Sequence, residues 1–464
     1  MFKFIICFGL LIIFFNFSAC SSVQKIEALK PEPDDAKPLL YENKSSFVGM
    51  PISIKLQDVE NQTNKLLTGL IYDDNKIEDD NLTVKIWKLS SITLDDIGGK
   101  IKIVLPLKVQ INYRYGIDKL GVALYDTREI NLNGNLNLKS EVTLSNWKMN
   151  TKTEFVSLDW NESPSITIAG KNIPITYLIN PALKLFRSKI EKNIDDAIKS
   201  AMDFKPNVMQ ALQKISAPLL LNPEYETWLR IVPNELFSTK AVLKNKNINL
   251  LMALKCNLES IVGQKPESKF DADKIVLQTA DKIQEKIDAN IVAVSTYKDA
   301  SNIMTKNFGG QIFENSNKKV TVQNVNIWHK NGKMVIALSL LGSINGTVYL
   351  TGFPQYNSVS KEIYFDKLDY VLDTKSKLLR TANWLASGLI LKKIQENCRY
   401  SLVQNLEDGK QNMLRYLKNY SPTGGVFVNG TLENITFQKI ELTNKAIIAF
   451  LNVSGTIRVA VDGL

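Results

Sequence analysis

The sequence predicts an α+β protein of two tandem modules, each pairing a strongly twisted antiparallel sheet with one long amphipathic helix. Three observations carry this prediction. Short segments alternate apolar and polar residues, two long segments have helical period, and one order of elements occurs twice. With 464 residues, of which 44% are hydrophobic, the chain can build more than one core.

The first module is expected at residues 45–205. A strand-like stretch leads into a short helical pattern at 58–71, and further strand-like segments follow at 82–87, 101–113, 129–138 and 142–148. Within this run, Asn133-Gly134 marks a place where a tight turn is expected. Asn180-Pro181 then opens a long helix. The apolar stripe of this helix consists of Leu183, Phe186, Ile190, Ile194, Ala197, Ile198 and Ala201.

The second module is expected at residues 263–464 and follows the same order. Helical patterns cover 274–289 and 298–313, and a strand rich in Val, Ile and Trp follows them. Asn331-Gly332 is a strong signal for a two-residue hairpin turn. A long helical region spans 376–420, with Gly388 and Gly409 as places where it bends or breaks, and alternating strands close the chain.

A short sequence echo supports an internal repeat. Leu66 to Tyr72 and Asn307 to Phe313 both end a helical pattern with glycine and then enter an apolar strand. The alternative is a chance match between two unrelated α+β modules. Residues 206–262 lie between the modules as a bridge, and their apolar content predicts a packed segment instead of a free linker.

The N-terminus has the features of an export signal. Lys3 provides a weakly basic start, Ile5 to Phe15 are nearly all apolar, and Ser18-Ala19 precede Cys20. This apolar run is shorter than the roughly 20 residues of a membrane-spanning helix. Residues 1–19 are therefore expected to be a signal peptide, and an ordinary signal peptide cut nearby is the alternative to a lipoprotein signal.

The end of this segment resembles the bacterial lipoprotein cleavage box. That resemblance implies that Cys20 becomes the lipid-modified first residue of the mature protein. Residues 20–44 contain Lys30-Pro31-Glu32-Pro33 and no apolar period, which predicts a flexible tether. Ser21 and Ser22 add no acidic export cue, so we expect a cell-envelope protein, lipid-anchored on the periplasmic face of the outer membrane of a Gram-negative bacterium.

The net charge of +10 comes mainly from lysine, because only 8 of the 57 basic residues are arginine. Nucleic-acid recognition favours clustered arginine, and no such cluster occurs, so a nucleic-acid partner is not expected. The positive balance suits anionic lipid headgroups. An ordinary solvated, lysine-rich surface is the simpler explanation.

The sequence offers no set of residues that suits catalysis or a metal site. His329 is the only histidine, and its place beside Asn331-Gly332 predicts an exposed hairpin end. One histidine and two spare cysteines are too few for an ordinary zinc site. Adjacent acids such as Asp195-Asp196 suit a glycosidase only if their carboxylates face one another. The simpler interpretation of such pairs is that they are solvated acids, mainly in turns. No enzyme, cofactor or metal is expected.

The sequence has four cysteines, and Cys7 leaves with the signal peptide, so Cys256 and Cys398 remain besides the one assigned to lipid. In an oxidising envelope compartment they form a possible disulfide between the two halves. Two buried free thiols are the alternative, because the sequence does not give their separation in space.

Several short motifs resemble the bacterial envelope family called domain of unknown function 4403. They are Trp228-Leu229 with Pro233, Gly352 to Tyr356, Ile363 to Tyr370, and Ala382-Asn383-Trp384-Leu385. That family resembles the tubular lipid-binding superfamily, which includes bactericidal permeability-increasing proteins. The resemblance implies two end-to-end modules, each a highly curved antiparallel sheet wrapped around a long helix, in an elongated body. It also implies acyl chains bound between sheet and helix.

A groove between sheet and helix is also where apolar ligands bind on general grounds. The candidate groove residues are Phe186, Ile190, Ile194, Leu385 and Leu389. The first hypothesis is therefore a lipid-anchored protein that binds or transfers lipid or another hydrophobic ligand. A non-catalytic structural or assembly partner of other envelope proteins is the alternative, as is a fully packed seam without ligand.

Overall fold

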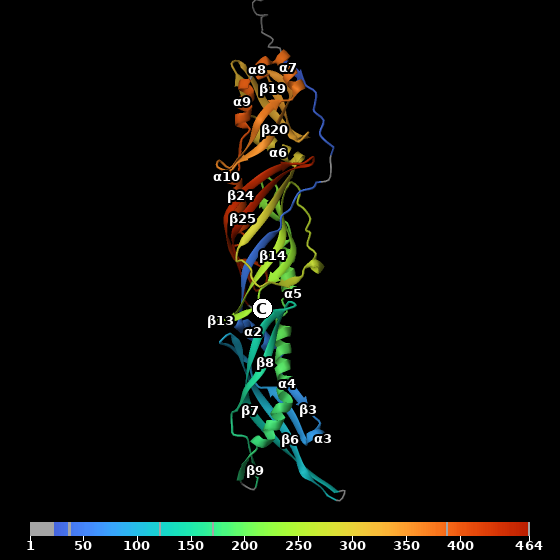
Figure 1. Cartoon of the computed structure of the whole chain (residues 1–464), viewed down its shortest axis with the longest axis vertical. Helices are drawn as coiled ribbons and strands as arrows, with labels where there is room; N and C mark the ends of the chain where they lie inside the picture. Colours follow the sequence, from blue (N-terminus) through green and yellow to red (C-terminus); the bar gives the residue numbers. More distant parts are fainter. Residues whose placement is uncertain (1–22, 36–38, 120–121, 169–170, 387, 463–464) are drawn as a thin grey trace, which may run out of the picture.

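The computed structural model describes residues 23–35, 39–119, 122–168, 171–386 and 388–462. The molecule is elongated, and its long axis carries three sheets one after another (Figure 1). We call them the first end sheet, the central sheet and the second end sheet. Most strand pairs in them are antiparallel, so the mainly antiparallel α+β character expected from the sequence is confirmed.

The first end sheet has the strand order β3-β4-β6-β7-β8, with β5 paired to β6. Its strands are β3 (Leu70–Asp74), β4 (Leu82–Lys88), β5 (Thr93–Ile97), β6 (Lys100–Lys119), β7 (Val122–Ser145) and β8 (Lys148–Trp160). A small hairpin of β9 (Ser165–Ile168) and β10 (Lys171–Pro174) follows. The helices of this region are α2 (Leu56–Leu66), α3 (Ile77–Asp80) and α4 (Thr176–Ala201).

The second end sheet has the order β17-β18-β19-β20-β21-β22. Its strands are β17 (Ile312–Asn315), β18 (Lys318–Lys330), β19 (Lys333–Gly342), β20 (Ile344–Asn357), β21 (Glu362–Tyr370) and β22 (Tyr400–Ser401), and β1 (Gln24–Glu27) pairs with β20. Its helices are α6 (Tyr297–Phe308), α7 (Leu372–Thr381), α8 (Asn383–Ala386) and α9 (Gly388–Asn397).

The central sheet has the order β11-β12-β14-β16-β2-β25-β24-β23. These strands are β2 (Ser46–Lys55), β11 (Leu219–Asn222), β12 (Thr227–Ser238), β14 (Asn247–Val262), β16 (Ile287–Thr296), β23 (Tyr420–Thr423), β24 (Val426–Leu442) and β25 (Ala446–Val461). The short β13 (Val242–Lys244) and β15 (Leu277–Thr279) pair with β14 and β12, and a 3₁₀ turn covers Ala272–Lys274. Two helices complete this part, α5 (Lys205–Ile215) and α10 (Val403–Leu414).

The central sheet draws strands from both halves of the sequence in a mirrored order. From one edge it contains β11, β12 and β14, and from the other β23, β24 and β25, with β16 and β2 between them. All ten residues of β2 pair antiparallel with β14, and all ten residues of β16 pair antiparallel with β25. Parallel pairing of β14 with β16 and of β2 with β25 joins the two groups.

The expected echo between the halves has a structural counterpart. Gly69 and Gly310 both lie between a short helix and the next strand, and both have positive φ, 68° and 85°. Glycine adopts this left-handed backbone without steric cost, which explains why both halves place it there. In each half, a strand of the central sheet, a short helix and the first strand of an end sheet therefore follow one another.

Three expectations about elements are wrong. Residues 274–289 form the end of the 3₁₀ turn, β15 and the start of β16 instead of a helix. Residues 376–420 do not form one long helical region, because they contain four helices, α7 to α10, and the short strand β22. Helix α9 begins at Gly388, where a break was expected, whereas Gly409 lies inside α10. Asn133-Gly134 lies inside the 24-residue strand β7, so no turn forms there.

The bridge at 206–262 is packed, as expected. It supplies most of α5 and also β11, β12, β13 and β14 of the central sheet.

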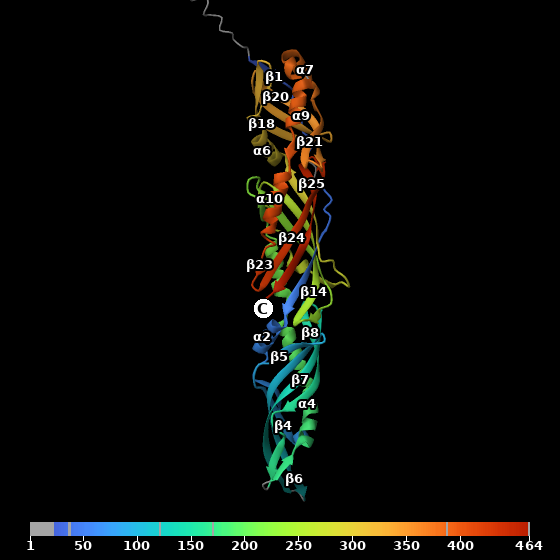
Figure 2. The same ribbon diagram turned by 90° about the vertical axis from the view of Figure 1, so that its left-hand side faces the viewer.

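The flexible tether expected at 20–44 is a docked segment in its described part, 23–35 and 39–44, which we call the strap. It runs along the outside of the second end sheet to the central sheet (Figure 2). Ala28 packs on a cluster of Val335, Ala337 and Tyr349, while Leu39 and Tyr41 pack on a second cluster of Val292, Val294, Ala446 and Ile448. Apolar contact holds the strap at both sites.

His329 also departs from its predicted exposed position. It is buried, with 8% of its surface exposed, because the strap covers it. Its Nδ1 lies 2.8 Å from Oδ2 of Asp34, and the same carboxylate oxygen accepts the backbone N–H of Asn331 at 2.8 Å. The hairpin at Asn331-Gly332 itself is confirmed, and both residues have positive φ.

Candidate functional site

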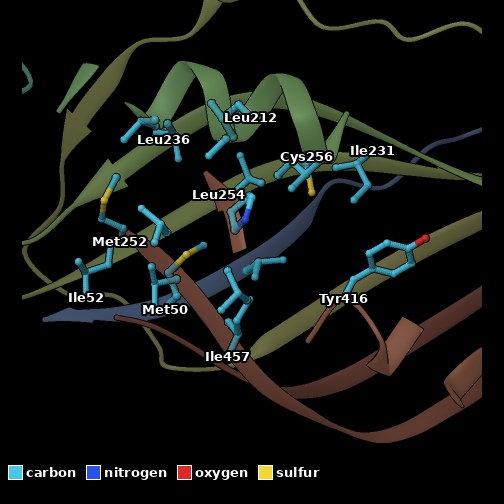
Figure 3. A pocket seen from close by; sticks show the side chains of 18 of the residues that line it. Met50, Ile52, Leu212, Ile231, Leu236, Met252, Leu254, Cys256, Tyr416 and Ile457 are labelled. Carbon is cyan, nitrogen blue, oxygen red and sulfur yellow. The ribbon is translucent and has the colours of Figure 1, made fainter. Parts of the chain in front are cut away.

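The central sheet encloses an apolar cavity with a volume of about 340 Å³. This volume lies at the lower end of the range of small-molecule sites, roughly 300–1,000 Å³. Strands contribute Val48, Met50, Ile52, Ile54, Leu219, Leu229, Ile231, Leu236, Leu250, Met252, Leu254, Cys256, Leu258, Leu277, Ile287, Ala289, Ile291, Val426, Val428, Leu432, Val453, Ile457, Val459 and Val461 to its wall. Figure 3 shows several of these side chains converging below α5.

Strand alternation explains why these strands present only apolar groups to the cavity. Successive residues of a strand point to opposite faces of a sheet. In β14, the even-numbered residues from Leu250 to Leu258 line the cavity, while Lys255, Asn257 and Glu259 occupy the other register. The same alternation runs from Val48 to Ile54 in β2. The inner face is therefore a continuous aliphatic surface.

Two short helices close part of the open side of this surface. Helix α5 contributes Asn207, Val208, Ala211, Leu212 and Ile215, and residues 413–417 at the end of α10 contribute Met413, Tyr416 and Leu417. Pro206 at the start of α5 fits the first helical turn, where its missing N–H costs no hydrogen bond. Asn412 Nδ2 donates to the backbone oxygen of Leu221, which ties α10 to β11.

The polar groups of the cavity are few and uncharged. Among the lining residues that the structure describes, Trp147, Asn207, Tyr416 and Tyr420 carry the polar groups apart from the Cys256 thiol, and none is charged. The rings of Tyr416 and Tyr420 meet edge to face, with centroids 5.6 Å apart. Such a site binds by burial of apolar surface and has little capacity to recognise a charged headgroup inside.

Cys256 lies in the wall of this cavity, whereas Cys398 lies in the core of the second end sheet. Both are free and buried, so of the two alternatives for this pair the structure has the free thiols, not the possible disulfide. Burial raises the pKa of each thiol to about 12. A thiol of this kind is a poor nucleophile, which leaves Cys256 as a small apolar wall residue.

The groove residues expected from the long helix lie elsewhere. Phe186, Ile190 and Ile194 have at most 1% of their surface exposed and pack with β6 and its neighbours under α4. Tyr72 packs against Phe186 with ring centroids 5.8 Å apart. These three residues are buried between α4 and the first end sheet and do not line the cavity.

The other predicted site residues do not line the cavity either. Leu385 is 1% exposed in the core of the second end sheet, and its backbone oxygen accepts the Tyr370 hydroxyl at 2.8 Å. The side chain of Leu389 and all of Cys20 fall outside the described residues. The cavity residues that sequence reasoning missed carried a readable signal, namely the alternation from Leu250 to Leu258 inside the supposed bridge.

Metal-ligating side chains do not cluster in the described part of the chain. Within the described ranges, no group of three His, Cys, Asp or Glu residues is placed to hold a metal ion. Asp195 lies on α4, as the predicted helix requires, and it accepts hydrogen bonds from Thr151 Oγ1 at 2.6 Å and from the Thr153 backbone N–H at 3.3 Å. The helices that the structure describes include none long and apolar enough to cross a membrane.

Comparison with known proteins places the chain in a family. The model of the family described as domain of unknown function (DUF4403) matches residues 44–461. The chain belongs to this family. The DUF4403 match covers the central sheet and both end sheets, and it confirms the relationship that the short motifs indicated.

Other comparisons are distant. No curated protein matches the sequence. One similar solved structure is described as "Crystal structure of lipopolysaccharide binding protein". Its sequence is 9% identical, the alignment covers 90% of this chain and 99% of that chain, and the TM-score is 0.25. Nothing about the ligand of the DUF4403 chain follows from a similarity at this level.

Proposed function

We propose that this DUF4403 protein is a lipid-anchored protein of the cell envelope that binds or transfers lipid or another hydrophobic ligand in the cavity of the central sheet. The anchor is Cys20, and the location is the periplasmic face of the outer membrane of a Gram-negative bacterium. The ligand enters without its charged group, because the wall offers apolar contact and little else.

One observation carries the proposal. The cavity is bounded by aliphatic side chains from distant parts of the sequence, from Val48 to Val461, and Ala289 and Ala211 keep space open from opposite sides. Well-packed interiors fill such a space, and an unfilled apolar volume of about 340 Å³ in a core costs stability unless a ligand occupies it. Each buried methylene of an acyl chain contributes about 0.8 kcal/mol, so about ten buried methylenes supply about 8 kcal/mol, which corresponds to a micromolar Kd.

We further propose that the two halves are tandem modules that arose by duplication. The mirrored strand order of the central sheet supports this, as does the recurrence of strand, short helix, meander and helices on both sides. Under this proposal the cavity lies at the junction of the modules, where each contributes one short covering helix, α5 or α10.

The test compares two tryptophan substitutions on one helix. Ala211 lines the cavity, whereas Gln213 is exposed on the same helix. A form starting at Ser21 is purified and its bound hydrophobic mass measured by native mass spectrometry. Ala211→Trp is expected to remove most of the co-purified mass because the indole fills the space, and Gln213→Trp is expected to retain it.

Two outcomes would overturn the ligand proposal. One is wild-type protein without bound mass that also fails to take up a fluorescent fatty acid. The other is equal retention by Ala211→Trp and Gln213→Trp. Lipid attachment is tested separately, by incorporation of labelled palmitate into the full chain and its loss in Cys20→Ala.

A further inference from the structure

We propose that α7, together with the start of the strap, is the face that rests on an anionic lipid bilayer, so that the protein stands with its second end sheet at the membrane. This inference rests on the proposed anchor at Cys20. It adds an orientation and a second, protein-borne contact with the membrane.

The reach of the chain limits where the anchor lies. Three peptide steps separate Cys20 from Val23, the first described residue. Each residue of extended chain spans at most about 3.6 Å, so the Cys20 Cα lies within about 11 Å of the Val23 Cα. A cysteine carrying acyl chains must lie at the bilayer surface. Val23 is therefore held close to that surface, and 55% of its own surface is exposed.

The strap transmits this constraint to the folded body because it is docked. Strand β1 pairs in parallel with β20 from Gln24 to Glu27, and the backbone N–H of Leu29 donates to Asp373 Oδ2 at 2.7 Å. Further along the strap, Lys30 lies over the Trp328 ring, 5.5 Å from its centroid. The first described residues therefore lie at the end of the body that carries α7, as Figures 1 and 2 both show.

Helix α7 has the residues that a bilayer contact requires. Leu372 and Leu379 are 79% and 55% exposed, and their spacing of seven places them on one face, opposite the buried Thr374 and Leu378. Because both leucines are largely exposed on one side of the helix, α7 presents an outward apolar face. An outward apolar face of this kind suits the interfacial region of a bilayer.

The charges around these leucines favour an anionic surface. Lys375, Lys377 and Arg380 lie on the same helix, against one acid, Asp373, which is held by the strap. Lys375 reaches Asp369 at 3.5 Å but remains half exposed, and Lys377 contributes, after Lys25, to lowering the pKa of Glu27. A basic residue near an anionic membrane contributes about 1 kcal/mol to binding, so this small cluster reinforces one lipid anchor.

The orientation determines where the cavity lies relative to the membrane. The central sheet lies beyond the second end sheet along the long axis, and the first end sheet lies farther still (Figure 1). The cavity is then held away from the anchoring bilayer, at a height set by the second end sheet. A ligand exchanged with this cavity leaves the plane of that membrane.

The first test uses the form starting at Ser21 and vesicles of phosphatidylglycerol or phosphatidylcholine in a sedimentation assay. Lys375→Gln/Arg380→Gln is expected to weaken binding to phosphatidylglycerol about 30-fold, from two basic contacts. The matched variant Arg128→Gln/Lys139→Gln removes one exposed arginine and one half-exposed lysine from the first end sheet. It is expected to bind as wild type. A loss in this variant instead, or in neither, would overturn the orientation.

The second test separates this inference from the proposed function. An environment-sensitive fluorophore is attached at Leu379→Cys or Leu124→Cys in the full chain on vesicles, since the two native thiols are buried and react slowly. A blue shift at 379 and none at 124 supports the inference. If the protein is lipidated and bound to vesicles but neither fluorophore shifts to the blue, the orientation is overturned and the anchor is not. Absence of lipid on Cys20 overturns the anchor and this inference together, while bound ligand in the cavity is measured independently.

Discussion

The first end sheet and the central sheet both have an apolar face covered by helices, but the two faces are covered to different extents. In the first end sheet, the 26-residue helix α4 lays Phe186, Ile190 and Ile194 against the strands, and each of them is at most 1% exposed. In the central sheet, α5 and α10 are 11 and 12 residues long, and a cavity remains beneath them. A long helix with a continuous apolar stripe covers more of a curved sheet than two short helices do.

The largest expected effect of a substitution on stability is in the first end sheet, under α4. Phe186→Ala should lower the free energy of unfolding by about 3–5 kcal/mol, because a buried ring with 1% exposure leaves a new void. Urea unfolding of the form starting at Ser21 measures it. A loss below 1 kcal/mol would mean that this end is as loosely packed as the central sheet.

The contact between α4 and its sheet also depends on Asp195, whose carboxylate accepts hydrogen bonds from Thr151 and Thr153. Asp195→Ala should cost about 2–3 kcal/mol, the range for hydrogen bonds to a charged group. Asp196→Ala, one residue on, serves as the control in the same unfolding assay. Equal losses from the two substitutions would show that the contact with β8 is not what stabilises α4.

A truncated side chain in the cavity wall should lower the free energy of unfolding less than one in the first end sheet. Leu254 already faces open space, so Leu254→Ala should cost about 2 kcal/mol or less, at the low end for Leu→Ala. Bound hydrophobic ligand should raise this cost, because the ligand loses contact with the leucine. If the cost equals that of Phe186→Ala without ligand, the central sheet is as well packed as the first end sheet.

The last prediction concerns the alkylation rate of the two buried thiols, Cys256 and Cys398, and involves no change in stability. Burial raises the pKa of both Cys256 and Cys398 to about 12, so each is almost wholly protonated at pH 8. Since the thiolate is the reactive form, alkylation of either should rise about tenfold per pH unit from pH 8 to 10. Pyrene maleimide should label Cys256 faster than Cys398, because only Cys256 lines the cavity. Mass spectrometry of the labelled peptides measures both rates, and equal rates would contradict an accessible cavity.

Short sequence patterns predicted the structure correctly where neighbouring residues alone determine the backbone conformation. Asn331-Gly332 forms its hairpin because both residues adopt positive φ between two registered strands. Asn133-Gly134 carries the same letters but lies in β7, where Gly134 pairs with Leu107 and Trp160. A Cβ at Gly134 would lie 2.8 Å from the Asp159 oxygen, so this glycine serves a close approach instead of a turn.

The groove residues show where local pattern fails. The stripe of Phe186, Ile190 and Ile194 correctly marked a buried helix face, but the sequence does not state whether the opposing sheet fills the space beside it. The strap gives the converse case. Its polar, proline-containing sequence predicted flexibility, yet Leu39, Tyr41 and Ala28 find apolar clusters on strands hundreds of residues away.

The amino-acid order alone determined which residues are apolar on each strand face, where the strongest turn falls, and to which family the chain belongs. The tertiary structure decided that the supposed bridge is the middle of the molecule, that Cys256 and Cys398 lie in separate cores, and that the unfilled space is under α5 and α10. The physical reason is that periodicity reports which side of an element avoids water. Whether that side meets a fitted neighbour or a gap depends on elements distant in the chain.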